Sequence, residues 1–236
     1  MALLDYIFPQ DIKCIFCGKE TADFAICEDC YKELPVISGK TCVKCGGRVS
    51  GNIDLCIDCK SIGRDFEKGF VIFDYVDDIQ DKILKFKNGG YRNIGRAFAH
   101  IMLEKFKTLD IAFDEIIPVP IHTNRRKQRG FNQSEILCLE IKKYYGRVHP
   151  ELLDRVLDTP HQASLGRVDR LNNLERAFKT NYKRRIKGKT ILLVDDIYTT
   201  GTTINECAKV LYKAGADKVY SLCLSRAPRL AEDFVE

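Results

Sequence analysis

Apolar residues in the last three quarters of the chain alternate between the spacing of strands and that of helices. Short apolar runs bounded by Gly, Pro or polar residues predict strands, and we expect these at 69–76, 115–119, 190–194 and 218–224, with a further short one at 148–153. The run at 190–194 is apolar throughout, which is typical of a central parallel strand covered on both faces.

Three segments carry apolar residues at helical spacing, and we expect helices at 94–106, 132–145 and 204–214. Asn132, with Glu135 three residues later, resembles a capping box, and Gly146 and Gly215 follow the last two helices. Because strands and helices alternate, the pattern predicts an α/β fold with an open parallel sheet.

The first 60 residues lack this pattern and hold few large apolar residues, so they need metal or disulfides to fold. Eight of the eleven cysteines lie here, in four Cys-x-x-Cys pairs. Each pair places two sulfurs on one tight turn, and two pairs complete a zinc tetrahedron. A secreted disulfide framework and a thioredoxin-like redox pair are the alternatives, but the regular pairs and the lack of an export signal favour zinc.

We therefore expect two structural zinc sites, with ligands paired in sequence order; interleaved pairing is the alternative. The ligands would be Cys14, Cys17, Cys27 and Cys30 at one site, and Cys42, Cys45, Cys56 and Cys59 at the other. Four thiolates around each metal leave no position open for water or substrate. The remaining cysteines are expected to be buried packing residues: Cys138, Cys207 and Cys223.

Charge changes where composition changes, since residues 1–60 carry a net charge of −2 and residues 61–236 carry +7. We expect a domain boundary near residue 60, with a zinc module at 1–60 and a larger domain at 61–236. No window holds the roughly 18 uncharged apolar residues that a membrane span needs. The N-terminus has no basic start and no cleavage site, so a cytoplasmic protein is expected.

The most informative stretch, 193–203, includes the end of the central strand. Asp195 and Asp196 lie where open α/β sheets bind ligands, beyond the carboxyl ends of the strands. A threonine-rich turn with Gly201 then opens a helix, and its amides and hydroxyls suit a phosphate. The carboxylates suit sugar hydroxyls, directly or through water on Mg²⁺. Together they predict a ribose 5-phosphate site; an acidic turn followed by an ordinary helix cap is the alternative.

This stretch resembles the phosphoribosyl-pyrophosphate (PRPP) signature of type I phosphoribosyltransferases. The chain is also similar to the competence protein F (ComF) family through residues 118–120 and 129–134, the four cysteine pairs, and the dispersed Arg155, Gln162, Arg170, Asn173 and Phe178. The resemblance implies a type I phosphoribosyltransferase domain behind a double zinc ribbon, with PRPP and Mg²⁺ as ligands. It also implies a part in DNA uptake (natural transformation), with single-stranded DNA and uptake proteins as partners and a place at the inner face of the cytoplasmic membrane.

The resemblance also implies roles for individual residues. Asp195 and Asp196 would be the catalytic residues, binding the ribose hydroxyls and Mg²⁺, and the 5-phosphate would bind to Thr199, Thr200, Gly201, Thr202 and Thr203. Loss of pyrophosphate requires neutralisation of charge, for which Lys87 and Arg129 are candidates. Thr202 stands where many of these enzymes have a second glycine, and no base-binding hood is recognisable.

Four cations precede an aromatic residue in the segment 125–131: Arg125, Arg126, Lys127 and Arg129, followed by Phe131. This composition is typical of a single-stranded nucleic-acid groove, but it also suits a pyrophosphate site, or a solvated loop whose Phe131 packs into the core. A second basic cluster, 183–189, precedes the central strand and is expected only to aid solubility. The segment 155–178 is expected to hold the loop that closes over the active site.

Three functions stay open on the sequence. The first is a ComF-type protein that binds PRPP with Mg²⁺ and handles imported single-stranded DNA. The second is a phosphoribosyltransferase with an unidentified acceptor, and the third is a PRPP-sensing module without chemistry. The phosphate-binding motif is common to all three, and the acceptor pocket has no readable motif.

Overall fold

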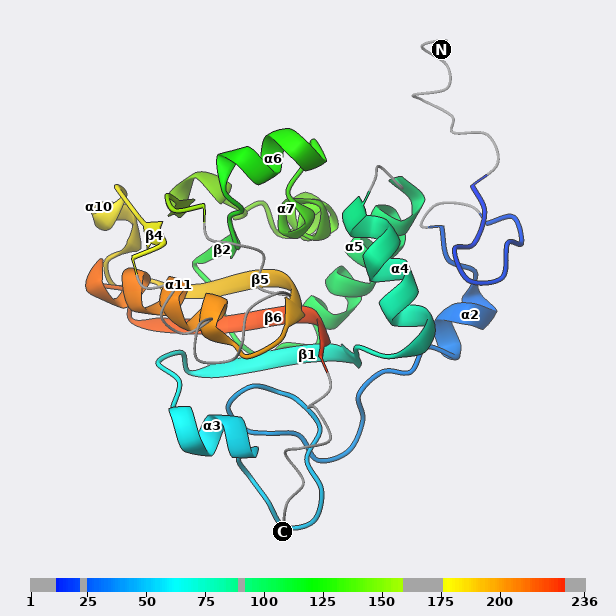
Figure 1. Ribbon diagram of the computed structural model, residues 1–236, viewed down its shortest axis with the longest axis horizontal. Coiled ribbons are helices and arrows are strands. Elements are labelled where there is room, and N and C mark those ends of the chain that lie inside the picture. Colours follow the sequence, from blue (N-terminus) through cyan, green and yellow to red (C-terminus); the bar gives the residue numbers. More distant parts are fainter. Residues whose placement is uncertain (1–11, 22–24, 89–91, 159–175, 228–236) are drawn as a thin grey trace.

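The computed structural model describes residues 12–21, 25–88, 92–158 and 176–227. Its centre is a parallel four-stranded sheet in the order β1-β6-β5-β2 (Figure 1). The strands are β1 (Lys68–Asp74), β2 (Glu115–Pro118), β5 (Thr190–Tyr198) and β6 (Lys218–Arg226). A small antiparallel ribbon pairs β3 (Asp154–Arg155) with β4 (Phe178–Lys179). The predicted open parallel sheet is confirmed.

Both faces of the sheet are buried. Successive residues of β5 enter two different hydrophobic clusters, with Leu192 and Val194 in one and Ile191 and Leu193 in the other. The first cluster also contains apolar residues of α4 (Asp77–Asn88), α5 (Arg92–Lys107), α7 (Gln133–Leu137) and α8 (Leu139–Tyr145). The second contains the apolar face of α11 (Thr202–Lys213). The continuous apolar run of the central strand is therefore explained by cover on both sides.

Several boundaries differ from the prediction. The strand expected to end at residue 194 continues to Tyr198, so the acidic pair lies within β5. The helix expected at 132–145 is interrupted at Cys138, which ends α7 and precedes α8. The expected strand at 148–153 is wrong: Val148 makes a single bridge to Ile116, and a 3₁₀ turn then spans Pro150–Leu152. Proline, whose φ is fixed and which lacks an amide hydrogen, suits the start of that turn.

Two helices were not predicted but matter for the site. They are α4 and α6 (Thr123–Arg129), and both are rich in charged residues. The remaining short helices are α2 (Glu28–Lys32), α3 (Ile57–Ile62) and α10 (Lys183–Ile186). No helix in the described parts of the chain is both long and apolar enough to cross a membrane.

The two cysteine-rich units pack on the sheet domain at different places (Figure 1). The first ribbon, around Cys14 to Cys30, contributes to the cluster that contains α5, and the Tyr31 ring lies 5.6 Å from that of His100. The second ribbon, Cys42 to Cys59, contributes its four cysteines to the cluster that contains α11. Its backbone also joins β1, since the Gly69 amide donates to the Lys44 carbonyl at 2.6 Å. Both ribbons therefore share hydrophobic cores with the sheet.

Candidate functional site

The eight N-terminal cysteines form two groups of four in sequence order. Within each group, all sulfurs lie within 4.8 Å of one another. The first group is Cys14, Cys17, Cys27 and Cys30, and the second is Cys42, Cys45, Cys56 and Cys59. The sulfurs of Cys17 and Cys27 are 3.6 Å apart, and those of Cys45 and Cys56 are 3.7 Å apart. A zinc tetrahedron with bonds of about 2.3 Å needs edges of about 3.8 Å. The geometry fits zinc, all eight thiols are free of disulfides, and the predicted pairing is confirmed.

The two groups differ in burial. All four cysteines of the second group are buried, whereas Cys17 is exposed and Cys27 and Cys30 are half-buried. The second group also receives two hydrogen bonds: the backbone amide of Cys56 donates to the Cys42 sulfur at 3.3 Å, and Arg226, from β6, donates to the Cys45 sulfur at 3.0 Å. Donors of this kind stabilise thiolates bound to a metal.

The other three cysteines, Cys138, Cys207 and Cys223, are buried, as predicted. Burial raises the pKa of each of these thiols. They stay protonated at neutral pH, so they act as packing residues rather than nucleophiles.

The acidic pair lies near the carboxyl end of β5. Asp195 Oδ1 accepts hydrogen bonds from Ser134 Oγ and from the Asp196 amide, both at 3.0 Å. Asp196 Oδ1 accepts from the Ile197 amide at 2.7 Å. Its other oxygen lies 3.0 Å from the ammonium group of Lys87, at the end of α4. Two separate helices therefore fix the two carboxylates.

The two carboxylates differ in their electrostatics. Burial, together with the neighbouring charge of Asp196, raises the pKa of Asp195 to about 7. Asp196 instead has the cation of Lys87 beside it. A carboxylate whose pKa is raised by burial gains most from a bound cation or hydrogen-bond donor, because that ligand replaces the lost water.

The turn after β5 is built around a left-handed glycine. Gly201 has φ +75°, and a Cβ at this position would collide with the Tyr198 hydroxyl. The hydroxyls of Thr200 and Thr202 are 2.8 Å apart, and Thr202 opens α11. Thr199 is exposed, while Thr203 is half-buried in the first turn of the helix. The predicted threonines are thus gathered at the positive end of a twelve-residue helix.

The predicted basic segment is a helix whose cations point in two directions. Arg125 and Arg129 are half-buried on one face of α6, and Arg129 donates to the Gln133 side chain at 3.4 Å. Arg126 and Lys127 are exposed, and Arg126 forms two hydrogen bonds with Glu135, at 2.6 and 2.8 Å. The Glu135 side chain thus pairs with Arg126, although Asn132 does cap α7 as predicted.

The inner face of α6 lies on the same side as the acidic pair. The pKa of Arg155 is lowered by burial and by the charge of Arg125, while the charge of Asp195 acts on it in the opposite sense. Arg155 is therefore close enough to interact both with Arg125 and with Asp195. Phe131 instead packs toward the core, with its ring 5.7 Å from that of Phe86.

Three residues near the site were missed by sequence reasoning. Ser134 belongs to the motif 129–134 but had no predicted role of its own, and its hydroxyl donates to Asp195. Arg64 donates to the Tyr198 hydroxyl at 3.2 Å and to the Thr200 carbonyl. Gln133 is buried, and its Nε2 has no hydrogen-bond partner among the residues that the structure describes. No local pattern distinguishes Ser134 and Arg64, since their partners come from distant parts of the chain.

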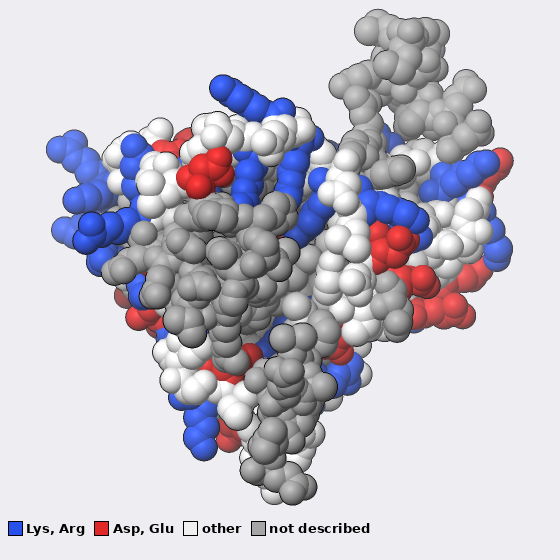
Figure 2. All heavy atoms as spheres, in the orientation of Figure 1, with Lys and Arg blue, Asp and Glu red and all other residues white. Residues whose placement is uncertain are grey.

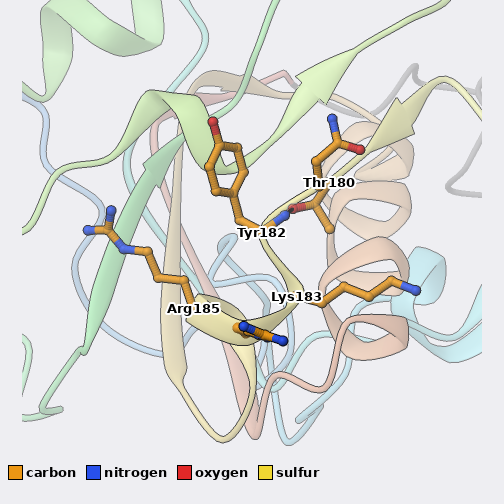
Figure 3. Close-up of a pocket in the computed structure, with 6 residues that line it drawn as sticks. Thr180, Tyr182, Lys183 and Arg185 are labelled. Carbon is orange, nitrogen blue, oxygen red and sulfur yellow. Dashed lines mark hydrogen bonds between the residues drawn. The ribbon is translucent and has the colours of Figure 1, made fainter.

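The second basic cluster lies at the other end of β5, as predicted. A shallow pocket of about 500 Å³ is lined there by consecutive residues, 180–185 (Figure 3). Arg185 pairs with Glu115 at 3.2 Å and Glu151 at 3.3 Å. Figure 2 shows Lys and Arg side chains gathered at the α10 end of the molecule and around α6. Within the part of the chain that the structure describes, this pocket is lined by a single short segment and by no residue of another element.

Most of the predicted closing segment, 155–178, lies outside the described residues, including Gln162, Arg170 and Asn173. Arg155 and Phe178 are described, and the Arg155 guanidinium lies 5.6 Å from the centre of the Phe178 ring.

Comparisons with known proteins cover both parts of the chain. A double zinc ribbon domain matches residues 3–60, and a phosphoribosyl transferase domain matches residues 136–233. The chain is 28% identical to competence protein F of Haemophilus influenzae, over 92% of this chain and 98% of that protein. It is 29% identical to the DNA utilization protein YhgH of Escherichia coli, over 86% and 91% of the two chains. It is also 30% identical to competence protein ComFC of Bacillus subtilis, over 95% of this chain and 94% of that protein. These matches agree with the two four-cysteine groups and with the parallel sheet that carries the acidic pair on β5. The chain therefore belongs to the ComF family of competence proteins.

Proposed function

We propose that this protein binds PRPP together with Mg²⁺ at the carboxyl end of β5. The observation that carries the proposal is the order of groups at the carboxyl end of β5: Asp195 and Asp196 come first, the Gly201 turn follows, and α11 then begins. Acidic groups at one end of the site and a helix N-terminus at the other match a ligand with a diol and a phosphate.

In this proposal Asp195 and Asp196 hold the ribose hydroxyls, and Thr199, Thr200, Gly201, Thr202 and Thr203 hold the 5-phosphate. Mg²⁺ would neutralise the pyrophosphate and act as a Lewis acid. Lys87 forms an ion pair with Asp196 in this structure. From this position its side chain can move to pair with the pyrophosphate instead. Arg125, Arg129 and Arg155 supply positive charge from the facing elements, as loss of pyrophosphate requires.

The proposal is tested by calorimetric titration of PRPP into the zinc-loaded protein with Mg²⁺. Asp196→Asn should lower the affinity by roughly 10-fold or more, because a charged hydrogen-bond partner is lost. Asp217→Asn is the matched control, since Asp217 is exposed and precedes β6 at the opposite end of the sheet. Wild-type protein that binds no PRPP, or an Asp196→Asn variant that binds as wild type does, would contradict the proposal.

The same samples separate the enzyme from the sensor. Release of pyrophosphate that depends on an added acceptor would indicate a phosphoribosyltransferase. Binding of PRPP without turnover, accompanied by a change in affinity for DNA, would indicate a sensing module. The relatives are named as competence and DNA utilization proteins, which supports a role in which the ligand site and DNA act together.

We also propose that the protein handles single-stranded DNA and that the exposed face of α6 contributes to this contact. Arg126 and Lys127 are exposed, and Phe131 is packed against Phe86. The contact would therefore be with phosphates rather than stacked bases, and its affinity would fall with salt. DNA-uptake proteins are further partners under this proposal.

Replacing both Arg126 and Lys127 by alanine should weaken single-stranded DNA binding at every sequence and lower the salt slope by about 1 for each cation removed. Fluorescence anisotropy at several salt concentrations measures both quantities. Replacing Lys142 and Lys143 on α8 by alanine is the control of equal charge. If the two double variants lose affinity equally, the contact reflects net charge and not this face of α6.

We place the protein in the cytoplasm, where cysteine thiolates stay reduced and able to hold zinc. The described residues offer no support for association with the inner face of the membrane. The division near residue 60 stays a prediction.

A further inference from the structure

Arg226, the last residue of β6, joins the second four-cysteine group to the candidate phosphate turn. Its side chain is buried, and its guanidinium donates to Cys45 at 3.0 Å, to Cys56 at 3.6 Å and to Asp58 at 3.4 Å. Gly47 makes room for this group, because a Cβ there would collide with it. A buried guanidinium is held here by two metal-ligand sulfurs and one carboxylate.

The other side of Arg226 faces Tyr198. The two residues are paired across β6 and β5, the guanidinium lies 5.7 Å from the centre of the tyrosine ring, and the Ala227 amide donates to the Tyr198 carbonyl at 3.0 Å. A cation over an aromatic face in a buried setting fixes the position of the ring. The Tyr198 ring is therefore fixed by a residue that depends on the second cysteine group.

Tyr198 in turn determines the shape of the turn that follows it. Its hydroxyl occupies the space that a Cβ at position 201 would fill, so this left-handed turn packs directly against the ring and only glycine fits there. Arg64, just after the second ribbon, donates to this hydroxyl and to the Thr200 carbonyl. The ribbon therefore reaches the turn by two routes, through Arg226 and through Arg64.

Asp65, the residue after Arg64, also contacts α11. The Asp65 amide donates to the Asn205 side chain at 2.8 Å, and the Asn205 side-chain amide donates back to Asp65 at 2.8 Å. The first ribbon has no corresponding contact with the turn among the described residues; three of its four cysteines, Cys14, Cys27 and Cys30, belong to the cluster that contains α5.

We propose that Arg226 and Tyr198 are positioning residues through which the second zinc site holds the phosphate turn in its binding conformation. The inference rests on the proposed binding of PRPP at this turn. The four thiolates and zinc carry a formal charge of −2, which the buried guanidinium partly offsets. When the metal no longer holds the sulfurs together, Arg226 loses its acceptors, and the Tyr198 ring loses the group that fixes it.

The test uses the full-length, zinc-loaded chain and measures both PRPP affinity and zinc retention. Arg226→Lys keeps the charge but cannot bridge two sulfurs and cover the ring at once, and Tyr198→Phe keeps the ring but removes the hydroxyl bound by Arg64. Each should weaken PRPP binding by roughly 2- to 30-fold while zinc content stays at two per chain. Arg48→Met is the matched control, because Arg48 lies in the second ribbon, beside the same cysteine group, but pairs with Asp74.

Coupling of binding free energies is reciprocal, so PRPP with Mg²⁺ should raise the affinity of one of the two zinc sites, measured at equilibrium by competition with a chromophoric chelator. This gain in zinc affinity should be present in wild type and in Arg48→Met and reduced in Tyr198→Phe. If wild type binds PRPP but the variants bind equally well and zinc affinity is unchanged, the coupling is wrong and the proposed ligand stands. If wild type binds no PRPP, both are wrong.

Discussion

Replacing Cys45 by serine is expected to destabilise the whole protein, whereas replacing Cys17 by serine should affect mainly the first ribbon. Cys45 is fully buried in the core cluster that includes α11, and it accepts a hydrogen bond from Arg226. Cys17 is exposed. Structural zinc contributes about 10–16 kcal/mol to the folding of small zinc modules, as much as the whole stability of a typical domain. Because the second site lies inside the core, loss of its metal should be felt throughout the sheet.

We expect Cys45→Ser to lower the melting temperature by about 10 °C or more, since about 1 kcal/mol corresponds to 2–4 °C at this size. Metal content and thermal unfolding of the purified chain measure the two effects together. Cys207→Ser is the control for placing a hydroxyl in the core, because Cys207 is fully buried and is not a zinc ligand. Equal losses for Cys17→Ser and Cys45→Ser would show that the two sites contribute alike.

The parts of this structure that could be predicted from sequence are those specified by local patterns. Four Cys-x-x-Cys pairs fix two tetrahedra because each pair spans a single tight turn. The apolar run at 190–194 identifies a central strand, and the glycine that follows the acidic pair identifies the turn before α11. Each of these features depends on neighbours within a few residues, so its spacing carries the information.

The rest depends on residues that meet only after folding. Arg226 and Cys45 are 181 positions apart, and Arg64 and Tyr198 are 134 apart. Nothing near these residues in the sequence distinguishes them from surface arginines. The division of α6 into two faces was missed because the segment was not predicted to be a helix. In a helix, residues four apart such as Arg125 and Arg129 share a face, which separates them from Arg126.

Asp195→Asn is expected to bind PRPP poorly and yet to be more stable than wild type at neutral pH. Asparagine can still accept the hydrogen bonds from Ser134 and the Asp196 amide through its side-chain oxygen. It removes a carboxyl whose pKa is raised by burial and by the charge of Asp196 to about 7, from an ordinary value of 3.8. Because this pKa is higher in the folded protein than in the unfolded chain, binding of the proton stabilises the fold. The stabilisation is complete below about pH 4 and is lost as the pH rises to about 7.

The stability gap between Asp195→Asn and wild type should therefore be largest above pH 7, at about 2 kcal/mol, and should narrow as the pH falls toward 4. Urea unfolding at several pH values measures it, with Asp217→Asn as the exposed control. Affinity for PRPP with Mg²⁺ should rise more steeply between pH 6 and 8 in the wild type than in the variant, because the phosphates of PRPP ionise in both cases but only the wild type gains the Asp195 carboxylate. A gap that does not change with pH would mean that Asp195 ionises normally. A variant that keeps wild-type affinity would remove Asp195 from the site. Greater stability together with weaker binding would mean that the buried carboxylate is kept at a cost to the fold because the ligand needs its charge.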